Sequence, residues 1–174
     1  MSDRIDVEKT SLEGVRLVTP AFCFEDFRGR NLETYNARLF AEAGIRVSWV
    51  QDSLSISSKH VLRGIHGDDR TWKLLSCPFG KIYVVVVNYD QSSREFRKWE
   101  GFVLSDRNRR QLLVPPKFGN GHLVLSDEAL FAYKLSEYTD SPSQFTLAWD
   151  DPALAIHWPV GTPLVSERDR QAAR

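Results

Sequence analysis

The chain has few cysteines and no long hydrophobic run. Its 174 residues include two cysteines, Cys23 and Cys77, which lie far apart and form no Cys-x-x-Cys motif. Such spacing signals neither a disulfide framework nor a cysteine-ligated metal, and it is typical of a reducing compartment. No apolar stretch approaches the ~20 residues of a membrane-spanning helix, and Met1–Asp6 lacks the basic and apolar regions of a signal peptide. We therefore expect a soluble, cytoplasmic protein that does not associate with a membrane.

An excess of one charge is also missing. Lys and Arg together number 23, and Asp and Glu together number 23. A balanced chain has no overall field to attract nucleic acid or a membrane surface, so any anion-binding site must be local. Repeats, low-complexity segments and linkers are lacking too, and the length suits one domain with a proper core. The sequence predicts a single domain over residues 1–174 and no nucleic-acid partner.

Short β-rich runs separated by turn residues make up most of the chain. Gly80–Asn88 predicts a buried strand, because β-branched residues fill its centre. One alternating run, Ile45–Val50, precedes it, and four further runs follow it: Phe102–Leu104, Gln111–Val114, His122–Leu125 and Leu130–Leu135. Most are spaced by about 8–12 residues, as in all-β sandwiches and barrels. Pro115-Pro116 and Gly119–Gly121 predict turns between them.

Helical patterns are confined to two places. Asn36–Ala43 predicts a short helix, because Ala, Leu, Phe and Glu cluster there and Gly44 can end it. The charged tail Glu167–Arg174 is expected to be helical or frayed. The predicted fold is therefore all-β, a jelly-roll β-sandwich with one or two short helices.

The most informative histidine is His66. The chain has four histidines: His60, His66, His122 and His157. An isolated histidine is usually a satisfied surface or core residue, but Arg63 precedes His66 closely, and Asp68 and Lys73 follow it. On an extended strand, positions 64, 66 and 68 face the same side, and Gly64 would leave space in front of the imidazole. This arrangement predicts a pocket around His66.

The same residues allow a metal site as an alternative. His66, Asp68 and His122 occur in the order of a two-histidine, one-carboxylate triad, which binds non-haem iron. The pattern is short, and the commoner His-x-His arrangement with a following Glu is absent. A metal-dependent oxygenase therefore stays open as a hypothesis at this point.

Segments spread over nearly the whole chain occur in one familiar order. They are Phe24–Gly29, Val50–Ser53, Val61–His66, Lys73-Leu74, Gln111-Leu112, Tyr133-Lys134, Trp149–Pro152 with Ile156–Pro159, and Ser166–Asp169. Together they resemble the dTDP-4-dehydrorhamnose 3,5-epimerase family, from about residue 17 to residue 170. The resemblance implies a cupin-type β jelly roll, a homodimer, and an isomerase that uses no metal and no organic cofactor.

In two segments the chain departs from the rhamnose-pathway pattern and resembles a side branch of that family. His66–Asp69 with Thr71–Leu74 resembles the epimerases of GDP-linked 4-keto-6-deoxyheptoses, and so does Pro115-Pro116 leading to Gly119–His122. The dTDP-rhamnose enzymes usually carry an aromatic residue and then Gln after the histidine, and His-Gly-Phe in place of Asn120-Gly121-His122. The resemblance implies a GDP-heptose-type or other unusual deoxysugar. It leaves open the nucleotide base, the sugar length, and whether C3, C5 or both are inverted.

The resemblance assigns four catalytic residues. A ketone at C4 acidifies the hydrogens on C3 and C5, so inversion needs a base on one face, an acid on the other, and a positive group near the C4 oxygen. His66 would be the base, since histidine titrates near neutral pH, and Asp169 would pair with it. Lys73 would stabilise the enolate oxygen. Tyr133 would return the proton from the opposite face.

Three of these residues also have an ordinary structural interpretation. Tyr133 lies in an alternating run and could be a core aromatic. Asp169 lies close to the C-terminus, where a solvated charge is usual. Lys73 could lie on the surface with its stem against Trp72. A third hypothesis is a cupin that binds sugar nucleotides without catalysis, although such a module needs no base and acid on opposite faces.

The resemblance also implies a substrate-binding set for a nucleotide-diphosphate 4-keto sugar. Arg63 and Arg28 match positions at the diphosphate, which a guanidinium binds with two hydrogen bonds. Glu33 and Gln51 match positions near the nucleoside, and Arg28 and Glu33 would act across the dimer by strand exchange. Five more residues complete the set: Ser53, Asp68, Asn120, His122 and Tyr138. Arg30-Asn31 replaces aromatic residues near the base pocket, which weakens the case for thymine.

Overall fold

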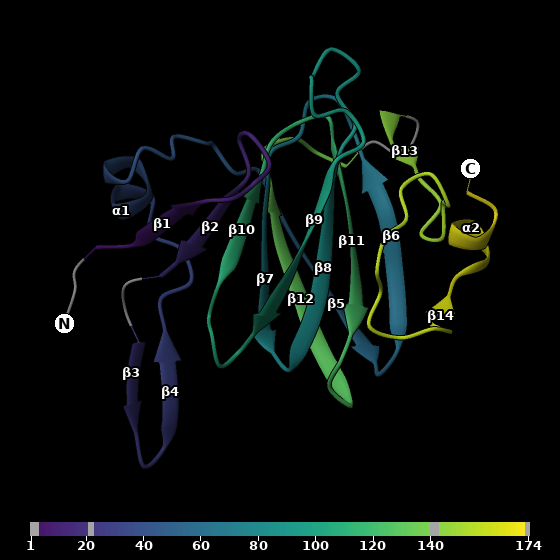
Figure 1. Cartoon of the computed structure of the whole chain (residues 1–174). Helices are drawn as coiled ribbons and strands as arrows, with labels where there is room; N and C mark the ends of the chain where they lie inside the picture. The colour runs from purple at the N-terminus through teal and green to yellow at the C-terminus, as the bar shows by residue number, and fades with distance from the viewer. Residues whose placement is uncertain (1–3, 21–22, 140–142, 173–174) are drawn as a thin grey trace.

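The structure, a computed structural model, describes residues 4–20, 23–139 and 143–172. Two β-sheets face each other as a sandwich (Figure 1). Sheet I has the strand order β1 (Asp6–Lys9), β2 (Arg16–Thr19), β10 (Gln111–Val114), β7 (Lys73–Phe79), β12 (Glu128–Leu135) and β5 (Gln51–Ser58). Sheet II has the order β13 (Phe145–Thr146), β6 (Val61–Gly67), β11 (Phe118–Val124), β8 (Lys81–Asn88) and β9 (Trp99–Ser105), with β14 (Leu164–Val165) parallel to β6.

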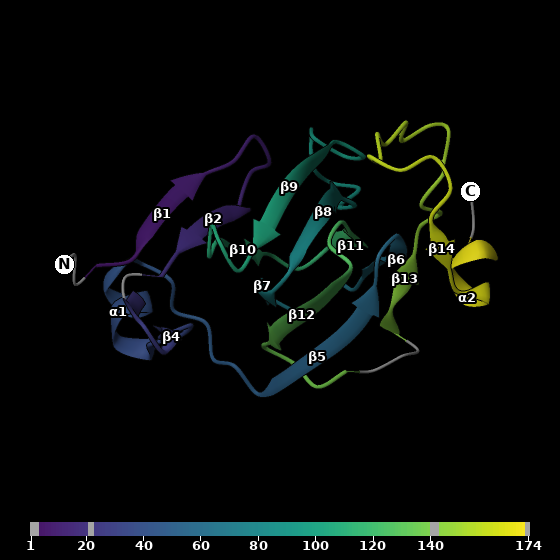
Figure 2. The same cartoon turned by 90° about the horizontal axis from the view of Figure 1, so that it is seen from below.

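A hairpin and two short helices complete the described fold. They are β3 (Cys23–Asp26) with β4 (Gly29–Leu32), α1 (Ala37–Glu42) and α2 (Glu167–Arg170). The hairpin extends away from the sheets, and α1 and α2 lie at opposite ends of the molecule (Figures 1 and 2). The predicted all-β sandwich with short helices is therefore confirmed. No helix among the described residues is long and apolar enough to cross a membrane.

The valine run of β8 explains how the core is divided. Val84–Val87 is fully buried, with 0% of each side chain exposed. Because alternate side chains of a strand point to opposite faces, the even-numbered valines pack between the sheets with Leu75. The odd-numbered valines pack on the outer face of sheet II against Leu147 and Leu154. A strand covered on both faces has a continuous apolar sequence, and each fully buried valine contributes about 1.5–3 kcal/mol.

Helix α1 covers the outer face of sheet I. The side chain of Asn36 caps it by accepting hydrogen bonds from Arg38 N and Leu39 N. Gly44 follows the helix with a φ of 81°, a conformation that glycine adopts without strain. Phe40 is only 2% exposed and packs against side chains of β2, β7 and β10. These features confirm the predicted helix and its ends.

The prediction of a strand at Ile45–Val50 is wrong. The side chains there do alternate between buried and exposed, but β5 begins only at Gln51. The inward side chains, such as Ile45 and Trp49, pack with α1 on the outer face of sheet I. Alternation shows which side of a segment faces the core, whereas a strand also needs a neighbouring backbone to pair with.

The prediction of a turn at Gly119–Gly121 is also wrong, because these residues lie within β11. The glycines allow β11 and β6 to approach closely. A Cβ on Gly119 would lie 2.7 Å from Ile65 Cγ2, and a Cβ on Gly64 would lie 2.6 Å from the Cα of Gly121. Gly64 also has a φ of 118°, which other residues rarely adopt. The absent side chain at Gly64 therefore admits the β11 backbone and does not open space in front of the imidazole.

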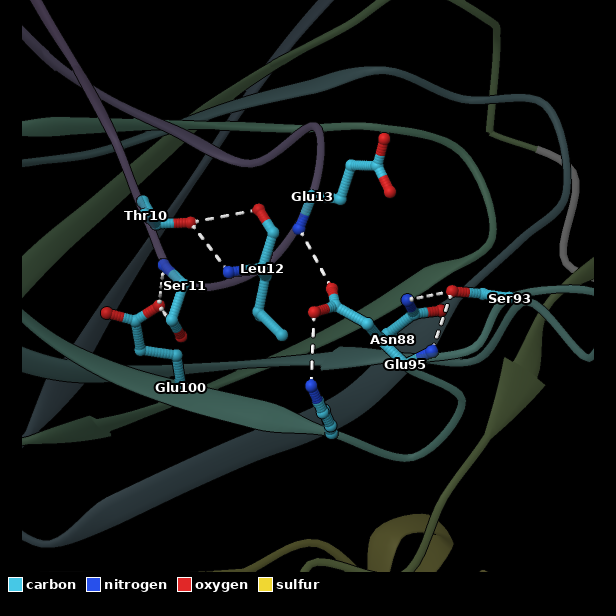
Figure 3. A network of polar contacts seen from close by, with 9 residues as sticks. Thr10, Ser11, Leu12, Glu13, Asn88, Ser93, Glu95 and Glu100 are labelled. Carbon is cyan, nitrogen blue, oxygen red and sulfur yellow. Dashed lines mark hydrogen bonds and ion pairs between the residues drawn. The ribbon is translucent and has the colours of Figure 1, made fainter.

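A polar network closes one edge of the sandwich (Figure 3). Ser11 donates from N and Oγ to Glu100 Oε2, at 2.9 and 2.6 Å. Glu13 N donates to Glu95 Oε2 at 3.1 Å. Leu12, between these two contacts, is 1% exposed and packs in the core between the sheets. The turn that joins β1 to β2 is thereby attached to β9 and to the loop before it.

Candidate active site

A cavity of about 820 Å³ opens between the two sheets. Its walls come from β5, β7 and β12 of sheet I and from β6 and β11 of sheet II. Residues 137–139, 143–144, 164–166 and 168–170 border it. Nine of the residues singled out in the sequence line it: Arg63, His66, Asp68, Lys73, Asn120, His122, Tyr133, Tyr138 and Asp169. The volume lies within the range of about 300–1,000 Å³ that is usual for small-molecule sites.

Helix α2 carries Asp169 to the imidazole of His66, which is 103 positions away in the sequence. His66 Nε2 lies 2.7 Å from Asp169 Oδ1, and Gly64 N donates to Asp169 Oδ2 at 3.3 Å. Ser166 caps the helix, because its Oγ accepts a hydrogen bond from Asp169 N at 3.2 Å. The charged tail therefore forms a helical turn over Glu167–Arg170, and Asp169 is only 3% exposed.

The electrostatics of this pair favour an ionised Asp169. Burial raises the pKa of Asp169, but the hydrogen bond and the charge of His66, with Gly64 N, outweigh burial and leave that pKa below its usual value. An ionised carboxylate only accepts hydrogen bonds, so we assign the shared proton to His66 Nε2. The other ring nitrogen, Nδ1, is then the basic one. Such a carboxylate fixes the tautomer and stabilises the imidazolium that forms when the ring takes up a proton.

Lys73 is a buried cation beside His66. Its Nζ lies 3.3 Å from Asn120 Oδ1, 3.4 Å from the carbonyl oxygen of His66 and 3.9 Å from Asp68 Oδ2. The lysine side chain is 11% exposed. Burial lowers the pKa of Lys73, and the negative charge of Asp68 offsets only part of that effect. The alternative of a surface lysine with its stem against Trp72 is therefore wrong.

Tyr133 and His122 form a connected part of the cavity wall. The ring of Phe131 stacks on the imidazole of His122 at 4.1 Å, and the Tyr133 ring lies 5.3 Å from the Phe131 ring. His122 is 3% exposed. Burial first, and then the positive charges of Arg63 and His66, lower the pKa of His122 to about 3. A histidine with this pKa is neutral at physiological pH, so His122 holds no proton that it could supply as an imidazolium.

Four residues of the predicted binding set do not line this cavity within the described chain. Arg28 lies in the β3–β4 hairpin, where it pairs with Asp26 at 2.7 Å and its side chain is 71% exposed. Glu33 follows the hairpin and accepts a hydrogen bond from Asn36. On β5, Gln51 Nε2 donates to Ser53 Oγ at 3.1 Å, and Ser53 borders a separate cavity of about 270 Å³.

The structure adds cations that the sequence did not single out. Three further arginines line the cavity: Arg70, Arg168 and Arg170. Arg168 Nη2 donates to Gln144 Oε1 at 3.3 Å. Each of the three lies within two positions of Asp68 or Asp169 in the sequence. Their closeness in sequence to a predicted site residue is the signal that could have identified them. Without that signal, the charges of a terminal tail are taken to be solvated.

The metal hypothesis finds no support in the ligand geometry. Within the described residues, no group of three or more His, Cys, Asp or Glu side chains could hold a metal ion. His66 Nε2 is bonded to Asp169, and Asp68 Oδ1 accepts hydrogen bonds from Arg70 N and Thr71 N. The triad of His66, Asp68 and His122 is therefore not assembled as a set of ligands.

Comparison with known proteins identifies similar chains over nearly the whole length. A family model described as dTDP-4-dehydrorhamnose 3,5-epimerase matches residues 9–174. A dTDP-4-dehydrorhamnose 3,5-epimerase of Shigella flexneri is 40% identical over 169 residues, which are 95% of this chain and 93% of that protein. A dTDP-4-dehydrorhamnose 3-epimerase of Streptomyces niveus is 38% identical over 165 residues, which are 92% of this chain and 79% of that protein.

The similarity extends to a solved structure. The dTDP-6-deoxy-D-glucose-3,5-epimerase of Legionella pneumophila, in complex with dTDP-4-keto-L-rhamnose, superposes with a TM-score of 0.91 at 35% identity. The match covers 97% of this chain and 92% of that chain. The cupin-type β-sandwich predicted for this sequence therefore agrees with the fold of a protein that is similar in sequence as well.

Proposed function

Because this chain belongs to the dTDP-4-dehydrorhamnose 3,5-epimerase family and is a nucleotide-sugar epimerase, we propose that it inverts C3, C5 or both of a nucleotide-linked 4-keto-6-deoxy sugar. The observation that carries the proposal is the dyad of His66 and Asp169, which borders the same cavity as Lys73 and Tyr133. A base, a cation and a phenol around one cavity are the groups that an epimerisation through an enolate requires.

In the proposed reaction the base is His66. Its Nδ1 takes the hydrogen from C3 or C5, and the electron pair of the broken C–H bond moves into the C4 ketone to give an enolate. Asp169 stabilises the imidazolium that results. The ketone of the substrate itself accepts the electrons, so proton transfer alone completes the inversion.

Lys73 and Tyr133 complete the proposed reaction. The ammonium of Lys73 donates to the C4 oxygen as negative charge builds up there, and Asn120 Oδ1 holds the ammonium in place at 3.3 Å. Tyr133 returns a proton to the face opposite His66. The resulting phenolate then takes a proton from solvent, and the imidazolium of His66 releases its proton to solvent. The cavity wall near Tyr133 is apolar, since Phe131 and Leu75 also line it.

For the substrate we propose a GDP-heptose-type or other unusual deoxysugar. Two features of this chain support the proposal: the segment His66–Asp69, and the replacement of the family's usual His-Gly-Phe by Asn120-Gly121-His122. His122 places a neutral polar ring in the wall of the cavity. Arg63, together with the three additional arginines, supplies positive charge for the diphosphate.

We also propose that the active species is a homodimer in which the β3–β4 hairpin reaches the partner's cavity. Phe27 at the hairpin tip is 97% exposed, and Leu54 and Ile56 on the edge strand β5 are 63% and 57% exposed. Apolar side chains this exposed, on a hairpin and an unpaired sheet edge, indicate an interface. Arg28 and Glu33 lie outside the cavity of their own chain. This position is expected of residues that act in the cavity of a partner.

The proposed activity is tested by proton NMR of several nucleotide-linked 4-keto sugars with the enzyme in deuterated water. Turnover of a true substrate introduces deuterium at C3 or C5, and the position of the label shows which centre is inverted. His66→Ala should slow this exchange by about 10²–10⁴-fold, the usual contribution of a general base. His60→Ala is the matched control, because His60 lies in the turn between β5 and β6 and does not line the cavity. Undiminished exchange in His66→Ala would remove His66 as the base.

A further inference from the structure

The turn between β6 and β7 is organised by the carboxylate of Asp68. Its Oδ1 accepts hydrogen bonds from Arg70 N at 3.0 Å and from Thr71 N at 2.7 Å, and its backbone oxygen accepts one from Lys117 N at 2.7 Å. Asp68 is 8% exposed. One carboxylate oxygen is thus fully engaged by backbone amides, and the other, Oδ2, lies 3.9 Å from Lys73 Nζ.

The ammonium of Lys73 has little contact with solvent that could stabilise its charge. The two other oxygens around Nζ belong to Asn120 and to the backbone of His66, and neither carries a formal charge. A buried ammonium tends to lose its proton unless an opposite charge lies close by. Oδ2 of Asp68 supplies such a charge from a residue that the backbone amides hold in place.

We propose that Asp68 is a positioning residue, the counter-charge that keeps Lys73 protonated and aimed at the substrate's C4 oxygen. The proposal rests on the proposed function, because it takes Lys73 as the group that stabilises the enolate. It also changes the role expected for Asp68 from substrate binding to positioning, because Asp68 lines the cavity but its Oδ2 lies toward Lys73. A carboxylate in this position would repel the diphosphate of the substrate, whereas it attracts an ammonium.

The other charged and titratable groups around Lys73 do not take over this role. From β6, His66 brings an imidazole whose partner carboxylate, Asp169, is already bonded to it. From β12 comes the phenol of Tyr133, while Arg70 and Glu137 border the same cavity from the turns beside it. The charge that raises the pKa of Lys73 against the effect of burial is that of Asp68.

The test replaces Asp68 with asparagine. Asp68→Asn keeps an oxygen that can accept the hydrogen bonds of Arg70 N and Thr71 N, while the negative charge is removed and the oxygen near Lys73 becomes an uncharged amide nitrogen. The titration of Lys73 is followed by carbon NMR of lysine labelled at Cε, with its signal assigned by its loss in Lys73→Met. We expect the midpoint of that titration to fall by about 1–3 pH units, the usual effect of one neighbouring opposite charge.

The pH profile of solvent-deuterium exchange provides the second measurement. With Lys73 less easily protonated, the alkaline limit of kcat/KM should move to lower pH together with the NMR midpoint, while the melting temperature stays near that of the parent. Asp127→Asn is the matched control, because Asp127 forms an exposed pair with Lys59 at 3.3 Å and neither residue lines the cavity. That variant should change neither the Lys73 titration nor the profile.

The two measurements test the counter-charge of Asp68 and the catalytic role of Lys73 separately. An unchanged titration of Lys73 in Asp68→Asn would overturn the counter-charge. A lowered midpoint with an unmoved alkaline limit would support the counter-charge and contradict the proposed role of Lys73 in catalysis. If Asp68→Asn does not fold, Asp68→Ser removes the same charge and retains a hydroxyl that suits the turn, so the same measurements apply to it.

Discussion

At the scale of single residues, Tyr133 has two roles, one in the core and one proposed in catalysis. It packs against the core between the sheets and also lines the cavity. Its ordinary role as a core aromatic and its proposed role as the acid are therefore compatible. Tyr133→Phe separates them, since phenylalanine keeps the ring in the core and removes the proton.

We expect Tyr133→Phe to slow inversion by about 10²–10⁴-fold, the usual contribution of a general acid, and to impair the first proton removal less. The measurement compares wash-in of deuterium with the appearance of inverted product. Tyr35→Phe is the control, because Tyr35 packs on the outer face of sheet I near Phe40. If wash-in and inversion fall equally in Tyr133→Phe, Tyr133 is not the acid.

At the scale of secondary-structure elements, the catalytic dyad depends on α2. This helix is only four residues long, Glu167–Arg170, and isolated helices of that length are not stable in water. Its position is set by the cap at Ser166 and by the two oxygens of Asp169, which bond to His66 and to Gly64 N. The order of the tail and the geometry of the dyad are therefore coupled.

Ser166→Ala should weaken the dyad by loosening α2. Loss of a capping side chain costs about 0.5–2 kcal/mol, so we expect kcat to fall by about two- to thirtyfold, with a small change in KM. Steady-state kinetics measures both values. Ser166→Thr retains the capping hydroxyl and should restore kcat. Equal losses in the alanine and threonine variants would show that Ser166 acts through something other than the cap.

At the scale of the whole molecule, the exposed hairpin and the edge strand β5 bear on the oligomer. Arg30 attaches the hairpin to its own chain, because its guanidinium donates to the backbone oxygen of Asp106 at 2.9 Å and to Asp106 Oδ2 at 3.0 Å. A hairpin whose second strand is anchored in this way, and whose turn exposes Phe27, is suited to extend into a second copy. In that arrangement Arg28 completes the partner's cavity and not its own.

Mixing two inactive variants tests this arrangement. Arg28→Ala and His66→Ala should each impair turnover alone, but a mixed dimer contains one cavity with both residues intact if Arg28 acts across the interface. Random reassortment of equal amounts makes about half of the dimers mixed, each with one intact site, so about a quarter of the parent activity should return. An activity assay after co-refolding measures this. No recovery, with mixed dimers verified by tagged chains, would place Arg28 in the cavity of its own chain or outside the reaction.

Most of the fold follows from local features of the sequence. The strand at β8, the helix after Asn36 and the all-β class follow from side-chain periodicity, capping and turn residues, which act over a few positions. The errors arise where a distant backbone decides. Gly119–Gly121 has the composition of a turn, yet it forms a strand because β6 lies against it. Ile45–Val50 alternates like a strand, yet its inward side chains pack on α1 and sheet I instead of joining a ladder.

The same division holds for the site. By itself, the sequence determined which residue types are present and, through its resemblance to a family, that His66, Lys73, Tyr133 and Asp169 belong together. Only the tertiary structure decided that Asp169 is buried against His66, that Asp68 faces Lys73, and that Arg28 lies outside the cavity. The physical reason is that these contacts depend on strand pairing and chain reversal over as many as 103 positions. A distance of 2.7 Å between His66 and Asp169 is a property of the packed sheets and of α2, and no short stretch of sequence contains it.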